Sequence, residues 1–231
     1  TEGIQAWLHR SPGIIIRKKD PPMPNSQINP ESNRKDTASL PAGGVKITEA
    51  LKTLLGRKEF GAITVADIAA TSGVNAALIY KYFGDKRGLL HHVLGDIIDE
   101  YLENLDRDLK GIKGALNKLR KLVWSHLYMY ETNRVLARML LLEVRNHHGY
   151  FESKSYQKVQ WYSSMVREII EEGIRDGEIR DDIPVWSIRQ VLFGAIEHQC
   201  LPGVIQGKAF NAEDLTDDLC NIIFSGIERR K

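Results

Sequence analysis

The sequence predicts an all-α fold. In every segment with periodic apolar residues, these recur at three- and four-residue intervals, which places them on one face of a helix. No such segment alternates apolar and polar residues as a half-buried strand does. The chain has 231 residues, of which 42% are apolar and 27% charged, so one or two soluble domains with a sizeable core are expected.

Composition divides the chain into three regions. Residues 1–43 are rich in Pro, Asn, Ser and Gly and poor in large apolar side chains, which predicts a disordered or loosely ordered tail. Residues 44–92 are predicted to form a small three-helix domain, and residues 93–231 a larger helical domain.

Charge is distributed unevenly between these domains. Residues 45–92 carry seven basic and four acidic side chains, a net charge of +3, whereas residues 93–231 carry 19 and 22, a net charge of −3. The basic excess therefore lies in the small domain, where it suits nucleic-acid phosphates. An excess of this size is also typical of an ordinary solvated surface.

The stretch over residues 64–90, TVADIAATSGVNAALIYKYFGDKRGLL, predicts two short helices joined by a tight turn. Thr64 precedes the first apolar face and Asp67 follows three residues later, both residue types that suit a helix start. Gly73 supplies the left-handed residue that ends the first helix, and Asn75 begins the second. The pattern is a helix-turn-helix, whose second helix enters the major groove of DNA.

Two further helices flank this motif. The first spans residues 45–55 and completes the three-helix domain. The second is long, begins at Asp85 and ends near Leu109, and joins the motif to the rest of the chain.

The motif contains Thr-Val-x-x-Ile-Ala, Gly-Val, Ile-Tyr-x-Tyr-Phe and Asp-Lys-Arg-x-Leu-Leu, in that order and without a gap. This order resembles the DNA-binding domain of the TetR family of bacterial transcriptional repressors. The resemblance covers about residues 45–93, roughly a fifth of the chain, and the remainder agrees in length and helical rhythm. It implies a homodimer that binds a double-stranded DNA operator.

The candidate DNA-binding residues lie on the second helix of the motif and beside it. They are Thr64, Asn75, Ala76, Ala77, Tyr80, Lys81, Tyr82 and Lys86. An Asn can bond adenine bidentately, Ala side chains can contact thymine methyl groups, and Lys can reach guanine or a phosphate. The resemblance implies phosphate contacts for Tyr80 and Lys86, and a similar role for Thr64.

Two of these assignments have alternatives. Asn75 can act as a helix cap alone, and the ring of Tyr80 can belong to the core. Leu78 departs from the family pattern, which most often has a small residue there, so it either turns inward or contacts an apolar base edge.

The larger domain is predicted to contain helices over residues 115–131, 134–147, 151–176 and 184–200, and from residue 211 or 212 to about 227. Pro184 suits the first turn of its helix, and Pro202 with Gly203 is expected to end it. The last two helices are broadly apolar. The resemblance implies that they pair with a second copy as a homodimer, and the alternative is that they close the monomer core.

The middle helices contain candidate ligand-binding residues: Trp124, Tyr128, Met139, Glu143, Tyr162 and Met165. Large apolar and thioether side chains suit an adaptable apolar pocket, and they suit a close-packed core equally well. The stretch LLLEVR, with EIIEEGIRDGEIRDDI and VLFGAIEH, is similar to the fatty-acid-responsive, acyl-CoA-binding branch of the family. That similarity implies a small apolar ligand, such as an acyl-CoA, among these helices.

No catalytic, metal or cofactor site is predicted. His126 with Glu131, or Glu143 with His147, could share a helix face, but neither pair has a nucleophile or metal motif beside it. Adjacent histidines, as at 91–92 and 147–148, point about 100° apart on a helix and do not converge on one ion.

No membrane or secretory segment is predicted either, since no run of 18 apolar residues occurs. Cys200 and Cys220 fit no zinc, redox or disulfide spacing, which favours reduced thiols in a cytoplasmic protein. The sequence therefore predicts a ligand-released repressor. The alternatives are a DNA-binding regulator without small-molecule sensing and, from another class, an all-α enzyme.

Overall fold

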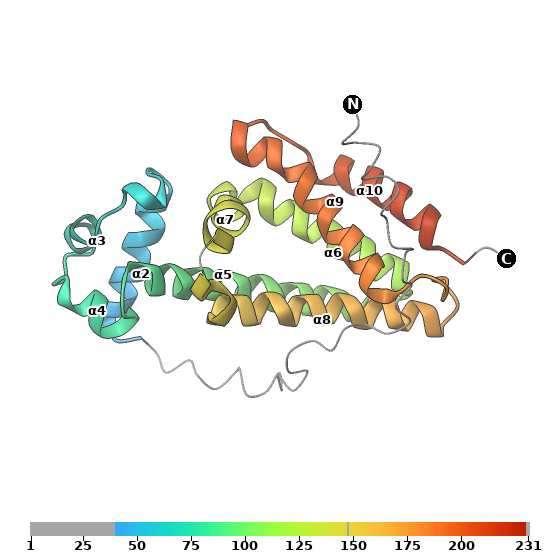
Figure 1. Cartoon of the computed structure of the whole chain (residues 1–231), viewed down its shortest axis with the longest axis horizontal. Helices are drawn as coiled ribbons and strands as arrows, with labels where there is room; N and C mark the ends of the chain where they lie inside the picture. The colour runs from blue at the N-terminus through green and yellow to red at the C-terminus, as the bar shows by residue number, and fades with distance from the viewer. Residues whose placement is uncertain (1–39, 147, 230–231) are drawn as a thin grey trace, which may run out of the picture.

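The structure, a computed structural model, describes residues 40–146 and 148–229 (Figure 1). Within this part the chain is helical apart from its connections and one isolated bridge between Ile179 and Glu228. The predicted all-α fold is confirmed. Residues 1–39 of the predicted tail lie outside the described residues.

Three helices and a short 3-10 turn form the head, by which we mean residues 42–83. These elements are α2 (Ala42–Leu55), η1 (Phe60–Ala62), α3 (Val65–Ser72) and α4 (Ala77–Phe83). Their apolar faces enclose a small core that includes Ile47, Leu51, Phe60, Ile68 and Ile79.

The helix α2 begins at Ala42, earlier than the predicted start at residue 45. Residues 42 and 43 fall in the predicted tail, because they continue its Pro- and Gly-rich stretch. Instead Gly44 is buried, and Leu40 lies directly against it, so the missing side chain allows a close approach that fixes the helix start.

The helix α5 (Lys86–Leu109) starts beside the head and runs through the body, by which we mean residues 86–229 (Figure 1). Asp85 caps it by accepting the N–H of Gly88 at 2.6 Å, as a short acidic side chain at an N-cap does. A Cβ on Gly88 would overlap the carbonyl oxygen of Phe83, so glycine permits the sharp turn from α4 into α5. The predicted long helix is confirmed.

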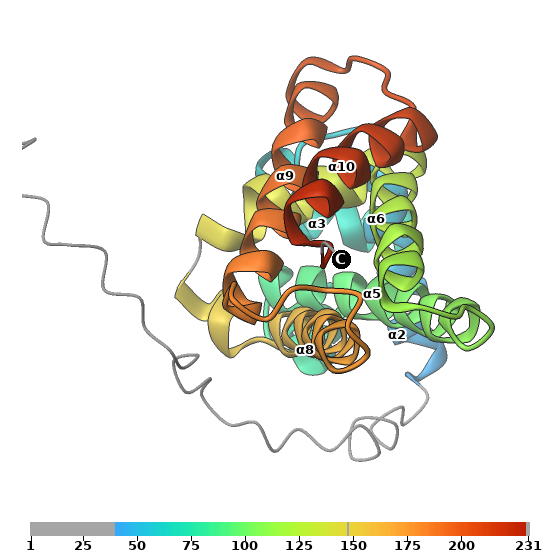
Figure 2. The ribbon, with the colours of Figure 1, turned by 90° about the vertical axis from the view of Figure 1, so that its right-hand side faces the viewer.

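Two long helices flank α5 in the body. The first, α6 (Ala115–Thr132), returns toward the head, and α8 (Lys154–Arg175) runs beside α5 in the same direction. Figure 2 shows α8 almost end-on, with α5 beside it. The last two helices, α9 (Val185–Gln206) and α10 (Ala212–Ile227), pack against α6 and against each other.

The segment after α6 differs from the predicted continuous helix over residues 134–147. A short α7 (Arg134–Arg138) passes into a π-helical turn, η2 (Met139–Glu143), and then into two 3-10 turns, η3 (Val144–Asn146) and η4 (His148–Glu152). In the π-helical turn the N–H of Val144 bonds the carbonyl oxygen of Met139, five residues earlier.

The prediction that Pro202 ends α9 is wrong. The helix continues through Pro202 to Gln206 and ends at Gly207, which has a left-handed φ of 71°. Pro202 is exposed, so the carbonyl group that loses its helical hydrogen bond lies on the solvent side, where water can bond it.

Candidate nucleic-acid interface and buried cavity

The start of α3 is fixed by a reciprocal pair of hydrogen bonds. Thr64 Oγ1 accepts the N–H of Asp67 at 3.0 Å, and Asp67 Oδ2 accepts the N–H of Thr64 at 2.9 Å. These bonds hold the pKa of the Asp67 carboxyl below its usual value. Because the Thr64 oxygen accepts within the protein, its O–H proton can still be donated to a group outside it.

Exposed side chains of the turn and α4 form one polar edge of the head. Asn75, Ala77, Tyr80 and Lys81 are exposed, and Ala76 is half-buried. The Asn75 Oδ1 accepts the N–H of Ala77 at 2.8 Å, so this side chain does cap the start of α4. The side chain of Tyr80 is 55% exposed and forms no hydrogen bond within the described residues, so its hydroxyl can meet an outside partner.

The opposite side of α4 supports α2. Leu78 turns inward, with its Cδ1 atom 3.5 Å from where a Cβ on Gly43 would lie. The half-buried ring of Tyr82 lies beside it, at 3.8 Å from the same point. Of the two alternatives predicted for Leu78, the structure therefore adopts the inward orientation. Tyr82 packs against α2 in the same way.

Lys86 holds together the connection between α2 and α3. Its Nζ donates to the carbonyl oxygens of Phe60 at 3.0 Å and Ile63 at 2.6 Å. The same ammonium lies 4.4 Å from the centroid of the Phe60 ring, a cation–π contact. Two of its three N–H donors are thus used inside the head, a role that the sequence pattern did not reveal.

The body contains a cavity of about 450 Å³ between α5, α6, α8 and α9, which residues of the segment η2–η4 also line. Its apolar wall includes Ile98, Leu102, Met129, Leu140, Val159 and Phe193. Its polar wall includes Tyr101, His126, Tyr130, Arg145, Tyr150, Tyr162, Ser163, Gln190 and Glu197. The volume falls in the range of small-molecule sites in proteins.

A buried chain of hydrogen bonds runs along this polar wall. The Tyr101 hydroxyl donates to the Tyr162 hydroxyl at 3.4 Å, and the Tyr162 hydroxyl lies 3.1 Å from His126 Nδ1. Burial lowers the pKa of His126 from 6.5 to about 4 and raises the pKa of Tyr101 to about 12. All three side chains are therefore neutral near pH 7.

One ion pair marks the mouth of the cavity. Arg145 of η3 donates from both terminal nitrogens to the Glu197 carboxylate of α9, at 2.8 and 2.6 Å. These hydrogen bonds raise the pKa of Arg145. The Arg145 side chain is 40% exposed, and the neighbouring wall residues Gln190 and Gly194 are exposed, so the opening lies between η3 and α9.

Two family profiles match the chain, one after the other. The profile of bacterial regulatory proteins of the tetR family matches residues 47–93, and that of the YsiA-like protein C-terminal region, a TetR-type domain, matches residues 94–226. The chain belongs to the TetR family. It is thus a DNA-binding transcriptional regulator whose helix-turn-helix is formed by α3 and α4.

Individual TetR-family relatives cover most of the chain. The fatty acid metabolism regulator protein of Bacillus subtilis (strain 168) is 24% identical over 186 residues, which is 80% of this chain and 96% of that protein. The repressor KstR2 of Mycolicibacterium smegmatis is 26% identical over 165 residues, 65% of this chain and 74% of that one.

Solved structures of TetR-type regulators share the fold. FadR from Bacillus subtilis in complex with stearoyl-CoA superposes with a TM-score of 0.72 at 24% identity, over 79% of this chain and 98% of that one. FadR from Bacillus halodurans gives a TM-score of 0.71 at 20% identity, over 81% and 97%.

Six side chains of this TetR-family chain were predicted to bind a ligand. One of the six, Tyr162, lines the cavity. Trp124 and Tyr128 stack on each other with ring centroids 4.9 Å apart, on the opposite side of α6 from His126 and Tyr130. Met165 lines a shallower hollow beside Lys118 and Glu172.

Met139 and Glu143 belong to the π-helical turn, and neither is part of the cavity wall. Met139 is 2% exposed and packs in the core, and Glu143 is half-buried. The pattern of large side chains identified the helices around the cavity, but not the helix faces that line it.

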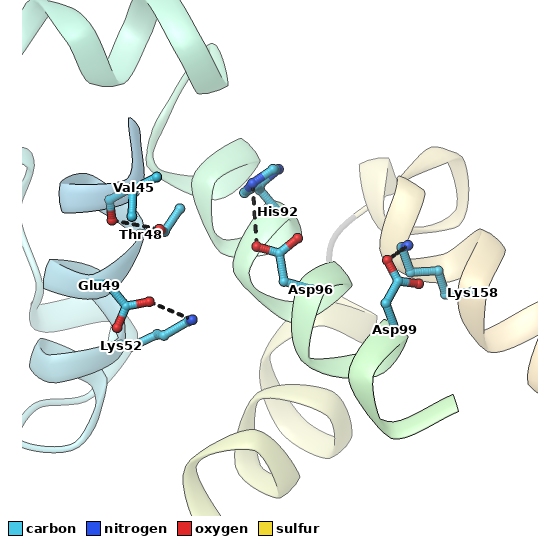
Figure 3. A network of polar contacts seen from close by, with 8 residues as sticks. All are labelled: Val45, Thr48, Glu49, Lys52, His92, Asp96, Asp99 and Lys158. Carbon is cyan, nitrogen blue, oxygen red and sulfur yellow. Dashed lines mark hydrogen bonds and ion pairs between the residues drawn. The ribbon is translucent and has the colours of Figure 1, made fainter. Parts of the chain in front are cut away.

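Polar contacts join the TetR-type head and the beginning of α5 to the rest of the body. Arg138 Nε, in α7, lies 2.9 Å from a carboxylate oxygen of Glu59, which precedes η1 in the head. Figure 3 shows Asp99 of α5 pointing toward Lys158 of α8, with which it forms an ion pair. Just before Asp99 on α5, His92 Nε2 lies 3.5 Å from an Asp96 carboxylate oxygen, one turn along the same helix (Figure 3).

Two other kinds of feature were sought in the described residues. Among residues 40–146 and 148–229 no group of three or more His, Cys, Asp or Glu side chains is placed to hold a metal ion. In the same ranges, no helix combines the length and the apolar character needed to cross a membrane.

The internal role of Lys86 predicts a loss of stability when its charge is removed. Lys86→Met keeps the apolar length over Phe60 but leaves two carbonyl oxygens without their donor, which is expected to cost about 1–3 kcal/mol of unfolding free energy. Lys81→Met is the control, because Lys81 is exposed on α4. Chemical denaturation followed by circular dichroism measures both, and equal stabilities would contradict the role assigned to Lys86.

The neutral His126 predicts a stability that falls with acidification. The unfolded chain protonates this histidine near pH 6.5 but the folded chain only near pH 4, so the unfolded state binds more protons in that window. Stability is thus lost as pH falls from 6.5 to 4, by about 3 kcal/mol in total at roughly 1.4 kcal/mol per pKa unit. In His126→Gln this part of the pH dependence is expected to vanish. Urea denaturation at a series of pH values measures the unfolding free energy of both proteins. The same loss of stability between pH 6.5 and 4 in both would contradict the role assigned to His126.

Proposed function

We propose that this chain is a repressor that binds a palindromic operator as a homodimer and is released by a fatty acyl-CoA. The observation that carries the proposal is the cavity, because one of its walls is α5, the helix that begins beside the head. Any ligand that changes the position of α5 also changes the position of the DNA-binding helix. Such a regulator acts in the cytoplasm.

The exposed edge of the head is the surface that meets DNA. Asn75, Ala76 and Ala77 lie at the start of α4, the part of a recognition helix that contacts base edges. Tyr80 and Lys81 reach phosphates or guanine from the same exposed edge. The Thr64 hydroxyl and the third N–H of Lys86 can each add one phosphate contact.

The dimer is formed through α9 and α10. Four large apolar side chains are exposed on these two helices: Trp186, Val191, Ile205 and Ile222. Val191 and Ile205 are 14 residues apart, close to four helical turns, and so lie on one face of α9. A two-fold dimer places two copies of α4 in successive major grooves about 35 Å apart.

The acyl group occupies the cavity, and the nucleotide part remains at its mouth. The apolar wall suits a hydrocarbon chain, and Arg145 at the opening provides a cation for phosphate or carbonyl oxygens. The Bacillus subtilis relative named as a fatty acid metabolism regulator, and the related fold solved with stearoyl-CoA, support this class of ligand.

Release follows from linkage. A ligand that binds more tightly to a conformation with mis-spaced heads lowers DNA affinity by the same factor. The contact of Arg138 with Glu59 gives a second path besides α5, because Arg138 immediately precedes η2 and Leu140 of η2 lines the cavity.

Fluorescence anisotropy with the palindromic DNA upstream of the chain's own gene tests this function. We expect specific binding, compared with random DNA of equal length, and an affinity lowered by about 5- to 150-fold by an acyl-CoA in the series from octanoyl-CoA to stearoyl-CoA. Free coenzyme A is the control ligand and is expected to leave binding unchanged. Specific binding that ignores the whole series would instead indicate a regulator that senses no acyl-CoA.

The proposed interface predicts that a charge at its centre prevents dimerisation. Ile222 is 71% exposed on α10, so Ile222→Glu is expected to leave the monomer folded while burying an unpaired charge in the dimer. Light scattering coupled to gel filtration is expected to show a dimer for the native chain and a monomer for the variant. Val45→Glu, at a residue 48% exposed in the head, is the matched control and should remain dimeric. A dimeric Ile222→Glu would place the interface elsewhere.

A further inference from the structure

Two buried tyrosines of the cavity wall have hydroxyl groups without a partner among the described residues. Tyr130 is 2% exposed and Tyr150 is 3% exposed, and both line the cavity. Neither hydroxyl forms a hydrogen bond within residues 40–146 and 148–229, and neither oxygen is fully enclosed by protein, so both are open to the cavity. Burial raises the pKa of both side chains, that of Tyr150 to about 12, so both keep their protons and can donate.

A third donor lies beside Tyr130. The Tyr162 hydroxyl accepts from Tyr101, and His126 Nδ1 is the one acceptor that the described residues offer its own proton, so that proton is directed to Nδ1. The neutral imidazole then carries its proton on Nε2, which has no acceptor among the described residues. The His126 and Tyr130 rings are 4.7 Å apart, so the two donors belong to one cluster.

The ion pair of Arg145 and Glu197 is close enough to act on this cluster. The charges of both residues influence the pKa of Tyr130, Tyr150 and His126. These side chains line the same cavity from α6, α9 and the segment η3–η4, so they form one polar site, and apolar lining residues such as Met129 and Phe193 lie beside it.

We propose that this site selects acyl chains that carry an oxygen substituent, a hydroxyl or keto group, over plain hydrocarbon chains of the same length. This inference rests on the proposed function, since it specifies the acyl group of the acyl-CoA. Water can satisfy the three donors while the cavity holds no ligand. A saturated chain that displaces this water leaves the donors without acceptors, whereas an oxygen on the chain replaces the lost bonds.

The donor set also argues against a cationic ligand, which a ring of aromatic side chains could otherwise hold. The carboxylate of Glu197 is already bonded by both terminal nitrogens of Arg145. Glu197 is the one carboxylate among the residues that line the cavity, so no unpaired acid is left there for a cation, whereas each of the three free groups can donate a hydrogen bond to a ligand oxygen.

Isothermal titration calorimetry on the full chain tests the selectivity without DNA. The ligands are dodecanoyl-CoA, β-hydroxydodecanoyl-CoA and ω-hydroxydodecanoyl-CoA, which place the oxygen at either end of the same chain. At least one hydroxylated ligand is expected to bind about tenfold or more tightly than dodecanoyl-CoA.

Tyr130→Phe and Tyr150→Phe remove one hydroxyl each and keep the ring. In at least one of them the preference for the hydroxylated chain is expected to fall by roughly fivefold or more, while dodecanoyl-CoA binds as before. A purely structural role would change the affinity for both ligands alike. Tyr156→Phe is the matched control, because Tyr156 packs on Tyr150 but does not line the cavity, and it should keep the full preference.

The outcomes separate this inference from the proposed function. If dodecanoyl-CoA binds as tightly as both hydroxylated ligands, or if the preference survives in both Phe variants, the selectivity is overturned and the acyl-CoA regulator stands. If none of the three ligands binds, while the chain still binds its operator, the selectivity and the acyl-CoA assignment fall together.

Discussion

The rest of the structure depends on the continuity of α5. Its first turns pack Leu89, Leu90 and Val93 into the apolar core, and its later turns place Tyr101 and Leu102 in the cavity wall. An α-helix resists a sharp kink because a kink breaks backbone hydrogen bonds, so a displacement at one end is carried toward the other. A change in the shape of the cavity is therefore expected to change the orientation of the head.

The polar wall of the cavity carries a cost that a fully apolar core would not. Buried hydroxyl and imidazole groups lose their hydration, and only a complete hydrogen-bond network recovers it. The bonds from Tyr101 through Tyr162 to His126 Nδ1 are formed within the protein, whereas His126 Nε2 and the hydroxyl groups of Tyr130 and Tyr150 are left open toward the cavity. This division separates a part of the wall that holds its shape from a part that is available to a ligand.

The head was largely predictable from sequence because its signals are local. The Thr64 and Asp67 cap, the left-handed Gly73 and the Asp85 cap each act within a few residues, and all three are present. The cavity was less predictable, because its wall depends on which face of each helix turns inward. Trp124 and His126 are two residues apart on α6 yet lie on different sides of it, and the pairing of Arg145 with Glu197 joins elements 52 residues apart. The continuation of α9 through Pro202 likewise depends on its exposed position and not on the residue type.

The π-helical turn η2 sets the register of everything that follows it. A turn with bonds five residues apart accommodates one residue more than an α-helical turn, and each residue of an α-helix rotates the chain by about 100°. Arg145, which faces Glu197, follows this turn by two residues. In a relative that had lost one residue within this turn, the residue after Arg145, Asn146 in this chain, would take its place in the order of residues. The deletion of a single residue in this turn can thus change which side chain a ligand meets at the mouth of the cavity, although no residue of the cavity wall is substituted.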